Sequence, residues 1–334
     1  MSDVSLSGKK IIFFGPKTFG YENAIVSELG LLGAEVTFHS HLPSEHPWGK
    51  AIFRLFPKLA WRYADHYFFT WLNQHGPATC DLVFVVKGEG LTPNFLQHLK
   101  KRYPNTRLIL HLWDSLVNCK HIQLKFPYFD SMTSFDPSDC KNVPQFRYRP
   151  LFFLDKYLNR EQNNTGQGVF FIGTLNGDRP EVIHRLIQSW KAASEFKYWL
   201  FVRSRLELML RKTFDRSLKQ IAESHLLYKS MSAETISQHY NECAAVLDIE
   251  HPNQSGLTMR TFEVIASGKK LITTNRKIVE HDFYDPARIC VIDRNNPAIP
   301  DDFLKAPTPA LSEDFIAHHS LRGWILDIMS PCTY

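Results

Sequence analysis

Arg260 and Glu263 stand three positions apart within segment 248–275, DIEHPNQSGLTMRTFEVIASGKKLITTN, and both residue types suit recognition of phosphate and sugar hydroxyls. The pattern predicts a strand, a polar loop and then a helix that begins near Ser255, so both side chains would share one side of that helix. A guanidinium can pair with phosphate oxygens in a fork, and a carboxylate can accept both hydroxyls of a ribose. Free N–H groups at the helix start favour a pyrophosphate. The alternative is an Arg–Glu surface pair, and the spacing alone favours neither.

A second candidate segment is 170–180, FFIGTLNGDRP, where a strand runs into a loop with two glycines and then a helix. It is neither a GxGxxG fingerprint nor a Walker loop, because no Lys-Ser/Thr pair follows the glycine. Gly173, Thr174 and Arg179 are its candidate ligand residues, and Arg203, just after the run YWLFV, is another candidate phosphate partner. The alternatives are a turn with a capped helix, and a solvated arginine at a helix start.

Asp114 and Glu89 are the candidate general bases, because each follows a buried apolar run, RLILHLW or DLVFVVK, at a predicted strand end. Asp114 followed by a serine could instead cap a helix, and Glu89 could be an ordinary loop carboxylate. No DxD motif and no HExxH motif occurs, so we expect no metal site. The six cysteines form no CxxC pair and are expected to be reduced, structural thiols.

These residues need a scaffold of alternating strands and helices, and the sequence predicts one in each half of the chain. In the first half, strands are expected at 10–15, 35–40, 81–87, 107–113 and 130–134, with helices at 21–32, 48–72 and 93–101. In the second half, strands are expected at 168–173, 198–202, 225–228, 244–249, 271–274 and 289–292, with helices at 179–193, 205–223, 234–243 and 257–267. We therefore predict an α/β protein with two Rossmann-like domains and a cleft between them.

The domain boundary is expected in the polar, amide-rich segment 155–167, which gives an N-terminal domain over 1–158 and a C-terminal domain over 168–334. The last helix of the chain could pack back on the N-terminal domain. A length of 334 residues fits two domains. A net charge of +5 suits an anionic small molecule or a lipid surface but is too small to indicate nucleic acid.

The start of the chain, MSDVSLSGKKIIFFG, indicates a first strand rather than a signal peptide. No stretch reaches the roughly 18 apolar residues of a membrane span, so we expect a cytoplasmic protein. Segment 48–72, WGKAIFRLFPKLAWRYADHYFFTWL, alternates basic and aromatic residues. It would suit peripheral contact with the inner face of the cell membrane, and a core helix with snorkelling basic residues explains it as well.

Segment 248–275 resembles the nucleotide-binding segment of GT-B glycosyltransferases, and the form SGLTMRTFEVIASGKKLITTN is especially similar to the CgeB-like branch of polysaccharide-biosynthesis pathways. The resemblance covers the C-terminal half well and the N-terminal half only in its strand–helix rhythm. It implies that Glu263 binds the donor ribose and Arg260 the diphosphate. The full set of implied donor-binding residues is Gly173, Thr174, Arg179, Arg203, Ser255, Gly256, Leu257, Arg260 and Glu263.

The same resemblance implies a metal-independent, cofactor-free hexosyltransferase that moves a sugar from a nucleotide-sugar donor to a glycan or lipid-linked acceptor. One departure concerns Ser255, which stands where many retaining members carry a second glutamate, so the stereochemical course does not follow from the motif. Two alternatives stay open, namely a sugar-nucleotide epimerase of the same fold and a non-catalytic sugar-nucleotide-binding module. An NAD-linked enzyme is disfavoured, because the first strand leads into GPKTFG rather than a glycine fingerprint.

Overall fold

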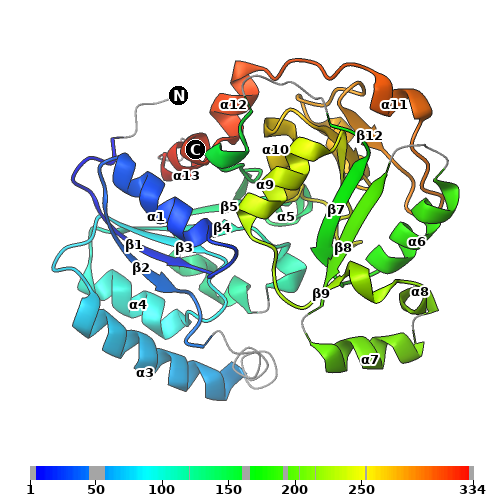
Figure 1. Ribbon diagram of the computed structural model, residues 1–334. Helices are drawn as coiled ribbons and strands as arrows, with labels where there is room; N and C mark the ends of the chain where they lie inside the picture. The colour runs from blue at the N-terminus through cyan, green and yellow to red at the C-terminus, as the bar shows by residue number, and fades with distance from the viewer. Residues whose placement is uncertain are drawn as a thin grey trace. The chain divides into compact units, whose positions relative to one another are not determined.

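The computed structural model describes residues 5–44, 57–119, 121–159, 166–190, 195–202, 204–214, 216–252 and 254–330. The chain divides into two compact units, each an α/β arrangement (Figure 1). Unit 1 comprises Met1–Leu151 together with Leu321–Tyr334, and unit 2 comprises Phe152–Ser320. The chain therefore leaves unit 1 after Leu151 and returns to it at Leu321 with its last helix.

The sheet of unit 1 is parallel, with strand order β2-β1-β3-β4-β5-β6. Its strands are β1 Lys10–Gly15, β2 Glu35–Ser40, β3 Leu82–Val86, β4 Arg107–Leu112, β5 Ser131–Ser134 and β6 Phe146–Tyr148. The central strands KIIFFG and LVFVV are almost wholly apolar because helices cover both faces of the sheet. The edge strand EVTFHS alternates polar and apolar residues and is only partly buried.

The helical elements of unit 1 follow the strands in the order expected of βαβ units. They are α1 Tyr21–Leu31, α3 Pro57–His75, α4 Pro93–Arg102, η1 Leu116–Asn118, η2 Ile122–Tyr128, α5 Pro137–Asn142 and α13 Leu321–Met329. Helix α4 shows why the sequence folds here. The Thr92 hydroxyl accepts the N–H of Phe95, Pro93 occupies the first turn, and basic residues fill the last turn.

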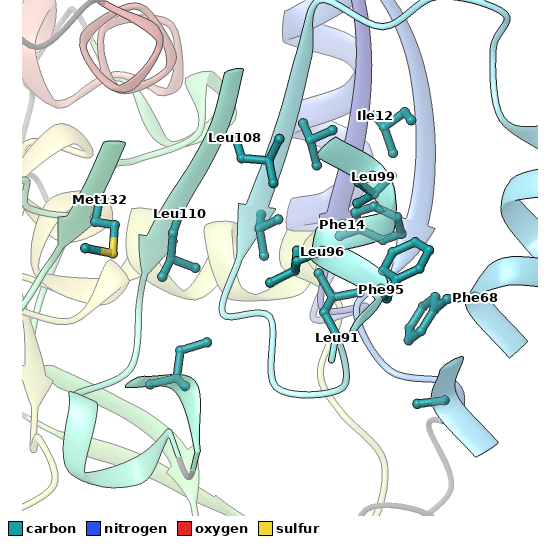
Figure 2. Close-up of a cluster of buried hydrophobic side chains, with 14 of the residues drawn as sticks. Ile12, Phe14, Phe68, Leu91, Phe95, Leu96, Leu99, Leu108, Leu110 and Met132 are labelled. Carbon is teal, nitrogen blue, oxygen red and sulfur yellow. The ribbon is translucent and has the colours of Figure 1, made fainter. Parts of the chain in front are cut away.

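Aromatic side chains fill the core on the α3–α4 face of the unit 1 sheet (Figure 2). Phe14 of β1, Phe68 of α3 and Phe95 of α4 meet there, with the Phe68 ring centroid 5.2 Å from that of Phe95 and 5.9 Å from that of Phe14. Leu108 and Leu110 of β4 continue this core along the sheet. The strand ends of unit 1 are thus held by a rigid, close-packed layer.

Helix α13 packs on the opposite face, where its Trp324 is completely buried. The indole lies against Phe84 of β3 and His111 of β4, at centroid distances of 5.9 Å and 4.9 Å. Arg147 of β6 pairs with Asp327 at 2.7 Å. The last helix of the chain is therefore an integral part of unit 1.

Unit 2 contains a second parallel sheet, with strand order β12-β11-β10-β7-β8-β9. Its strands are β7 Val169–Thr174, β8 Phe196–Phe201, β9 Leu226–Leu227, β10 Ala245–Asp248, β11 Lys270–Thr273 and β12 Ile289–Val291. The helical elements are η3 Asp155–Tyr157, α6 Arg179–Ser189, α7 Arg205–Phe214, α8 Arg216–Lys219, η4 Glu223–His225, α9 Ala233–Glu242, α10 Met259–Ala266, η5 Arg276–Glu280, α11 Asp301–Lys305 and α12 Glu313–His319. Among the described residues, no helix is both long and apolar enough to cross a membrane.

Candidate functional site

The strand order of each sheet reverses at one position, and ligands of open α/β sheets bind beyond the carboxyl ends of the strands at such a point. In unit 2 the reversal lies between β7 and β10, and in unit 1 it lies between β1 and β3. Each reversal point has a cluster of charged side chains next to it. We name them the β7–β10 cluster (Arg179, Asp248, Glu250, Arg260, Glu263 and Arg294) and the β3–β4 cluster (Lys87, Glu89, Asp114 and Lys125).

Arg179, the first residue of α6, joins the two strand ends at the reversal point of unit 2. Its Nε donates to the carbonyl of Ile249 at 2.8 Å, just after β10, and its Nη1 donates to the carbonyl of Thr174 at 3.1 Å, at the end of β7. No described residue accepts a hydrogen bond from Nη2. Burial, followed by the nearby Arg260 guanidinium, lowers the pKa of Arg179 to about 10. Arg179 is thus a cation beside another cation, with one donor left for an anion.

Arg260, in the first turn of α10, is held over the ring of Phe171 at 5.7 Å from its centroid. Gly173 makes room for that ring, because a Cβ at this position would lie 2.7 Å from the tip of Phe171. Nη1 of Arg260 lies 3.5 Å from Oδ1 of Asp248, the last residue of β10. Nε is buried and has no acceptor among the described residues. The guanidinium therefore has a long ion pair with Asp248, a side-chain hydrogen bond with Tyr240 and an unused donor at Nε.

The environment of Arg260 keeps it charged. Burial acts to lower its pKa, but Tyr240, Asp248 and Glu263 outweigh that effect, so the pKa is raised. Asp248 is itself buried and accepts from the hydroxyls of Thr258, at 2.6 Å, and Thr261, at 3.2 Å. Asp248 thus fixes both the start of α10 and the direction of Arg260.

Glu263 is 6% exposed and lies in the middle of α10. Its charge raises the pKa of both Tyr157 of η3 and Tyr240 of α9, although burial is the larger cause for each phenol. Glu263 therefore belongs to a buried group with Tyr157, Tyr240 and Arg260. The exposed Arg–Glu surface pair, which the spacing alone allowed, is not what the structure contains.

Helix α10 begins later than the sequence suggests. Its first residue is Met259 and its cap is Thr258, whereas the pattern placed the start near Ser255. Ser255 and Gly256 instead form the preceding loop, where the amide of Asn275 donates to their carbonyls at 3.3 Å and 3.4 Å. Leu257 is 2% exposed and anchors that loop in the core. The helix starts late because the Thr258 side chain is held by Asp248.

A partly buried ion-pair network flanks Arg179. Arg294, which follows β12, pairs with Asp178 and with Glu250, each at 2.6 Å, and Glu250 also accepts from the Thr274 hydroxyl. Burial raises the pKa of Glu250 even though the hydrogen bonds from Thr274 and Arg294 oppose this. Glu250 is therefore committed to Arg294 and Thr274 and is not a free carboxylate.

The two candidate bases of unit 1 meet at one ammonium group. Lys87 Nζ lies 2.5 Å from Oδ2 of Asp114 and 3.6 Å from Oε1 of Glu89. Burial acts to lower the pKa of Lys87, but the charges of Asp114 and then Glu89 outweigh burial, so the pKa is raised overall. Asp114 and Glu89 lie at the ends of neighbouring strands, and Lys87 holds them together.

The loop that carries Lys87 and Glu89 is strained and tightly held. Lys87 has a φ of 71°, which is unfavourable for a residue with a side chain, and Gly88 follows with 66°. The buried ammonium of Lys125, in η2, donates to the carbonyls of Gly88 at 2.7 Å and Glu89 at 2.9 Å. Burial lowers the pKa of Lys125 to about 7. Such strain persists only where the surroundings fix the backbone, and Lys125 supplies part of that fixation.

Some sequence predictions fall elsewhere. Arg203 lies outside the described residues, as does the part of segment 48–72 that precedes Pro57. The remainder of that segment is helix α3, whose Ala64, Phe68 and Leu72 are completely buried in the core of unit 1. In its described part, this segment is thus a core helix. Within the described residues, no three His, Cys, Asp or Glu side chains are placed to hold a metal ion.

Several residues that belong to these clusters or interact with their members were not predicted from the sequence: Tyr157, Asp178, Tyr240, Asp248, Lys125 and Arg294. Asp248 had a usable signal, because it ends the apolar run AAVLD at a strand end. The others depend on contacts between segments far apart in the chain, such as Asp178 with Arg294.

Comparisons with known proteins identify the fold. No family model and no curated protein matches the chain. Solved structures do match over nearly its whole length. A glycosyltransferase from Rickettsia africae ESF-5 aligns with a TM-score of 0.55 and 12% identity, covering 96% of both chains. AviGT4, a glycosyltransferase involved in avilamycin A biosynthesis, aligns with a TM-score of 0.55 and 13% identity, covering 95% of this chain and 93% of that one.

A third match is Alr3699/HepE of Anabaena in complex with UDP-glucose, with a TM-score of 0.55, 10% identity and coverage of 96% of this chain and 98% of that one. At such low identity the likeness concerns the fold. The prediction of an α/β protein with two Rossmann-like domains of the GT-B type is confirmed.

Proposed function

We propose that this chain is a glycosyltransferase that moves a hexosyl group from a nucleotide-sugar donor to a glycan or lipid-linked acceptor. The proposal extends to a CgeB-like enzyme of cell-surface polysaccharide synthesis that works in the cytoplasm, where nucleotide sugars are made. The observation that carries it is the pair Arg179 and Arg260 at the reversal point of the unit 2 sheet. One of the proteins that share this fold was crystallised with UDP-glucose.

The β7–β10 cluster suits a diphosphate leaving group. Arg179 and Arg260 lie close enough for one to depress the pKa of the other, and each has a donor that no described residue uses, Nη2 and Nε respectively. A diphosphate would relieve the repulsion between the two cations and accept from the free Nη2 of Arg179. Fixed positive charges next to the developing negative charge lower the barrier without a metal ion.

Glu263 is the proposed ribose ligand. A carboxylate kept in a buried group with Tyr157, Tyr240 and Arg260 has a fixed orientation, which is what bidentate recognition of two hydroxyls requires. Gly173, Thr174, Ser255, Gly256 and Leu257 are proposed to shape the surrounding donor site. Of these, the carbonyl of Thr174 is already held by Arg179.

Asp114 is the proposed general base toward the acceptor hydroxyl, with Glu89 as its neighbour on the same ammonium. For Asp114 to accept a proton, the Lys87 ammonium at 2.5 Å must turn toward Glu89 or toward the substrate. The arrangement thus offers a carboxylate to remove a proton and a neighbouring cation to balance the charge.

The decisive experiment combines nucleotide binding with product analysis. The melting temperature should rise with one of UDP, GDP, CMP or dTDP, because a ligand that binds the folded state stabilises it by mass action. Glu263→Gln should weaken that nucleotide by about 1–3 kcal/mol, the range for a hydrogen bond to a charged group. Glu242→Gln, an exposed glutamate on α9, is the matched control and should bind as the wild type does.

Three results would contradict the proposal. If none of UDP, GDP, CMP and dTDP stabilises the protein, the proposed donor site is wrong. If a donor sugar is isomerised without any acceptor, the chain is an epimerase of the same fold. If the donor binds but is neither transferred nor hydrolysed with any acceptor fraction, the chain is a binding module.

A further inference from the structure

Helix α7, Arg205–Phe214, carries an apolar stripe on the side that faces away from the core of unit 2. Leu206, Met209 and Leu210 are 63%, 62% and 55% exposed, and their spacing of three and four residues places them on one face. Leu208 points the other way and is 6% exposed, within the core of unit 2. The helix is therefore anchored by one face while a second apolar face meets solvent.

This arrangement is unusual among the apolar side chains of the described residues. The other large exposed ones are Phe19, Leu31, Tyr63, Val117, Leu124, Ile187 and Val279, each on an element that shows no second one at helical spacing. Helix α3 also carries many aromatic residues, but Phe68 and Leu72 are buried in the core. Isolated exposed apolar residues are normal, whereas a continuous stripe on one helix face indicates a binding surface.

Basic residues border the stripe. Arg205 and Lys212 lie along one side of it by helical spacing. From Arg205 to Lys219 the sequence contains five basic and two acidic residues, a net charge of +3 against +5 for all 334 residues. The short segment that exposes its apolar face thus also carries a net positive charge.

We propose that α7 is a membrane-docking helix that lies in the interface of an anionic lipid bilayer, with Leu206, Met209 and Leu210 among the acyl chains. A helix with an apolar stripe and basic borders binds such a surface because apolar burial and attraction to anionic headgroups act together. Figure 1 draws α7 at the margin of unit 2, next to α8, against which it packs. This inference does not depend on the proposed function.

Charge favours a lipid surface over a second copy of this chain. Two α7 helices that met stripe to stripe would bring together two segments of net charge +3 each. Such like-charge contact is unfavourable unless counter-charges lie opposite. An anionic bilayer supplies these charges at its surface.

The test uses the full chain with sedimented vesicles, either of phosphatidylcholine alone or of equal parts phosphatidylcholine and phosphatidylglycerol. The wild type should bind the mixed vesicles at least about tenfold more tightly than the neutral ones, since each basic residue near the surface contributes favourably. High salt should reduce this preference by screening. The triple variant Leu206→Ser, Met209→Ser and Leu210→Ser should bind both vesicles at least about tenfold more weakly.

A control variant, Leu31→Ser with Val279→Ser, removes exposed apolar side chains from other elements and should bind as the wild type does. A melting temperature and a circular dichroism spectrum like those of the wild type must accompany the triple variant, so that lost binding reports the surface rather than the fold. A wild type that fails to bind mixed vesicles, or a triple variant that binds them unchanged, overturns the proposal. A dimer in solution that the triple variant abolishes, with no vesicle binding, would show that a second copy covers the stripe.

Discussion

Replacing Lys125 with methionine should change how the stability of unit 1 depends on pH. The Lys125 side chain is completely buried, and its amine donates to two consecutive backbone carbonyls, those of Gly88 and Glu89. Burial lowers its pKa from the usual 10.5 to about 7, with Glu89 and then Cys119 opposing the shift. A neutral amine still has two protons to donate, so both hydrogen bonds survive when the group loses its charge.

The sign and size follow from proton linkage. Between pH 7 and 10.5 the unfolded chain keeps a proton that the folded chain has released, so raising the pH favours the folded state. At about 1.4 kcal/mol per pKa unit, the wild type should gain about 2.5 kcal/mol between pH 6 and pH 9. Lys125→Met lacks the titrating amine and should not show this gain in stability between pH 6 and pH 9. The variant also loses the two hydrogen bonds to the carbonyls of Gly88 and Glu89, which lowers its stability equally at both pH values.

Urea unfolding at pH 6 and pH 9, followed by tryptophan fluorescence, measures the difference. Comparing the two proteins at each pH cancels every other titrating group that they share. Lys101→Met, on the exposed side of α4, is the control for loss of a lysine and should show no such pH-dependent difference. A gain under about 1 kcal/mol for the wild type relative to Lys125→Met would refute the reasoning, because the buried amine would then stay charged across this range.

Two further predictions concern catalysis. Arg260→Lys keeps the charge but loses the planar guanidinium over Phe171 and its contact with Asp248, so the turnover number should fall by about tenfold or more. A variant with wild-type turnover would limit Arg260 to a structural role. Asp114→Asn should abolish transfer while leaving nucleotide binding and the melting temperature unchanged. A melting temperature several degrees lower, with activity regained on cooling, would instead identify Asp114 as a structural partner of Lys87.

The strands could be predicted closely because their signals are local. The runs KIIFFG and EVTFHS have the same bounds as β1 and β2, since each run begins and ends with a polar residue or a glycine. β6, Phe146–Tyr148, was missed because three residues offer no alternation to detect. The predicted helix 205–223 is broken into α7 and α8, with Leu208 and Leu218 in the core and Leu206 outside it.

The candidate site was only partly predictable, because its chemistry depends on pairs that the chain brings together from a distance. Strand ends pointed to Asp114 and Glu89, but nothing in the sequence placed Lys87 against both. The separation of Arg260 from Glu263 placed them on one helix, whereas the burial of Glu263 beside Tyr157 requires η3 to pack on α10. Lys125 sits in an apolar run, IQLKFPY, where a snorkelling lysine would be the ordinary expectation.

The two arginines of the β7–β10 cluster differ in how much of each is available to an anion. Arg260 already has Asp248 as a counter-ion, and Tyr240, Asp248 and Glu263 together keep its pKa raised against the effect of burial. Arg179 donates only to backbone carbonyls, and burial followed by Arg260 depresses its pKa to about 10, although Asp248 and Glu250 act to raise it. An incoming diphosphate therefore gains more from Arg179, whose charge is the less compensated of the two. We therefore propose that Arg179 is the principal phosphate ligand of the donor site, and that Arg260 contributes mainly by its fixed charge and by orienting Glu263.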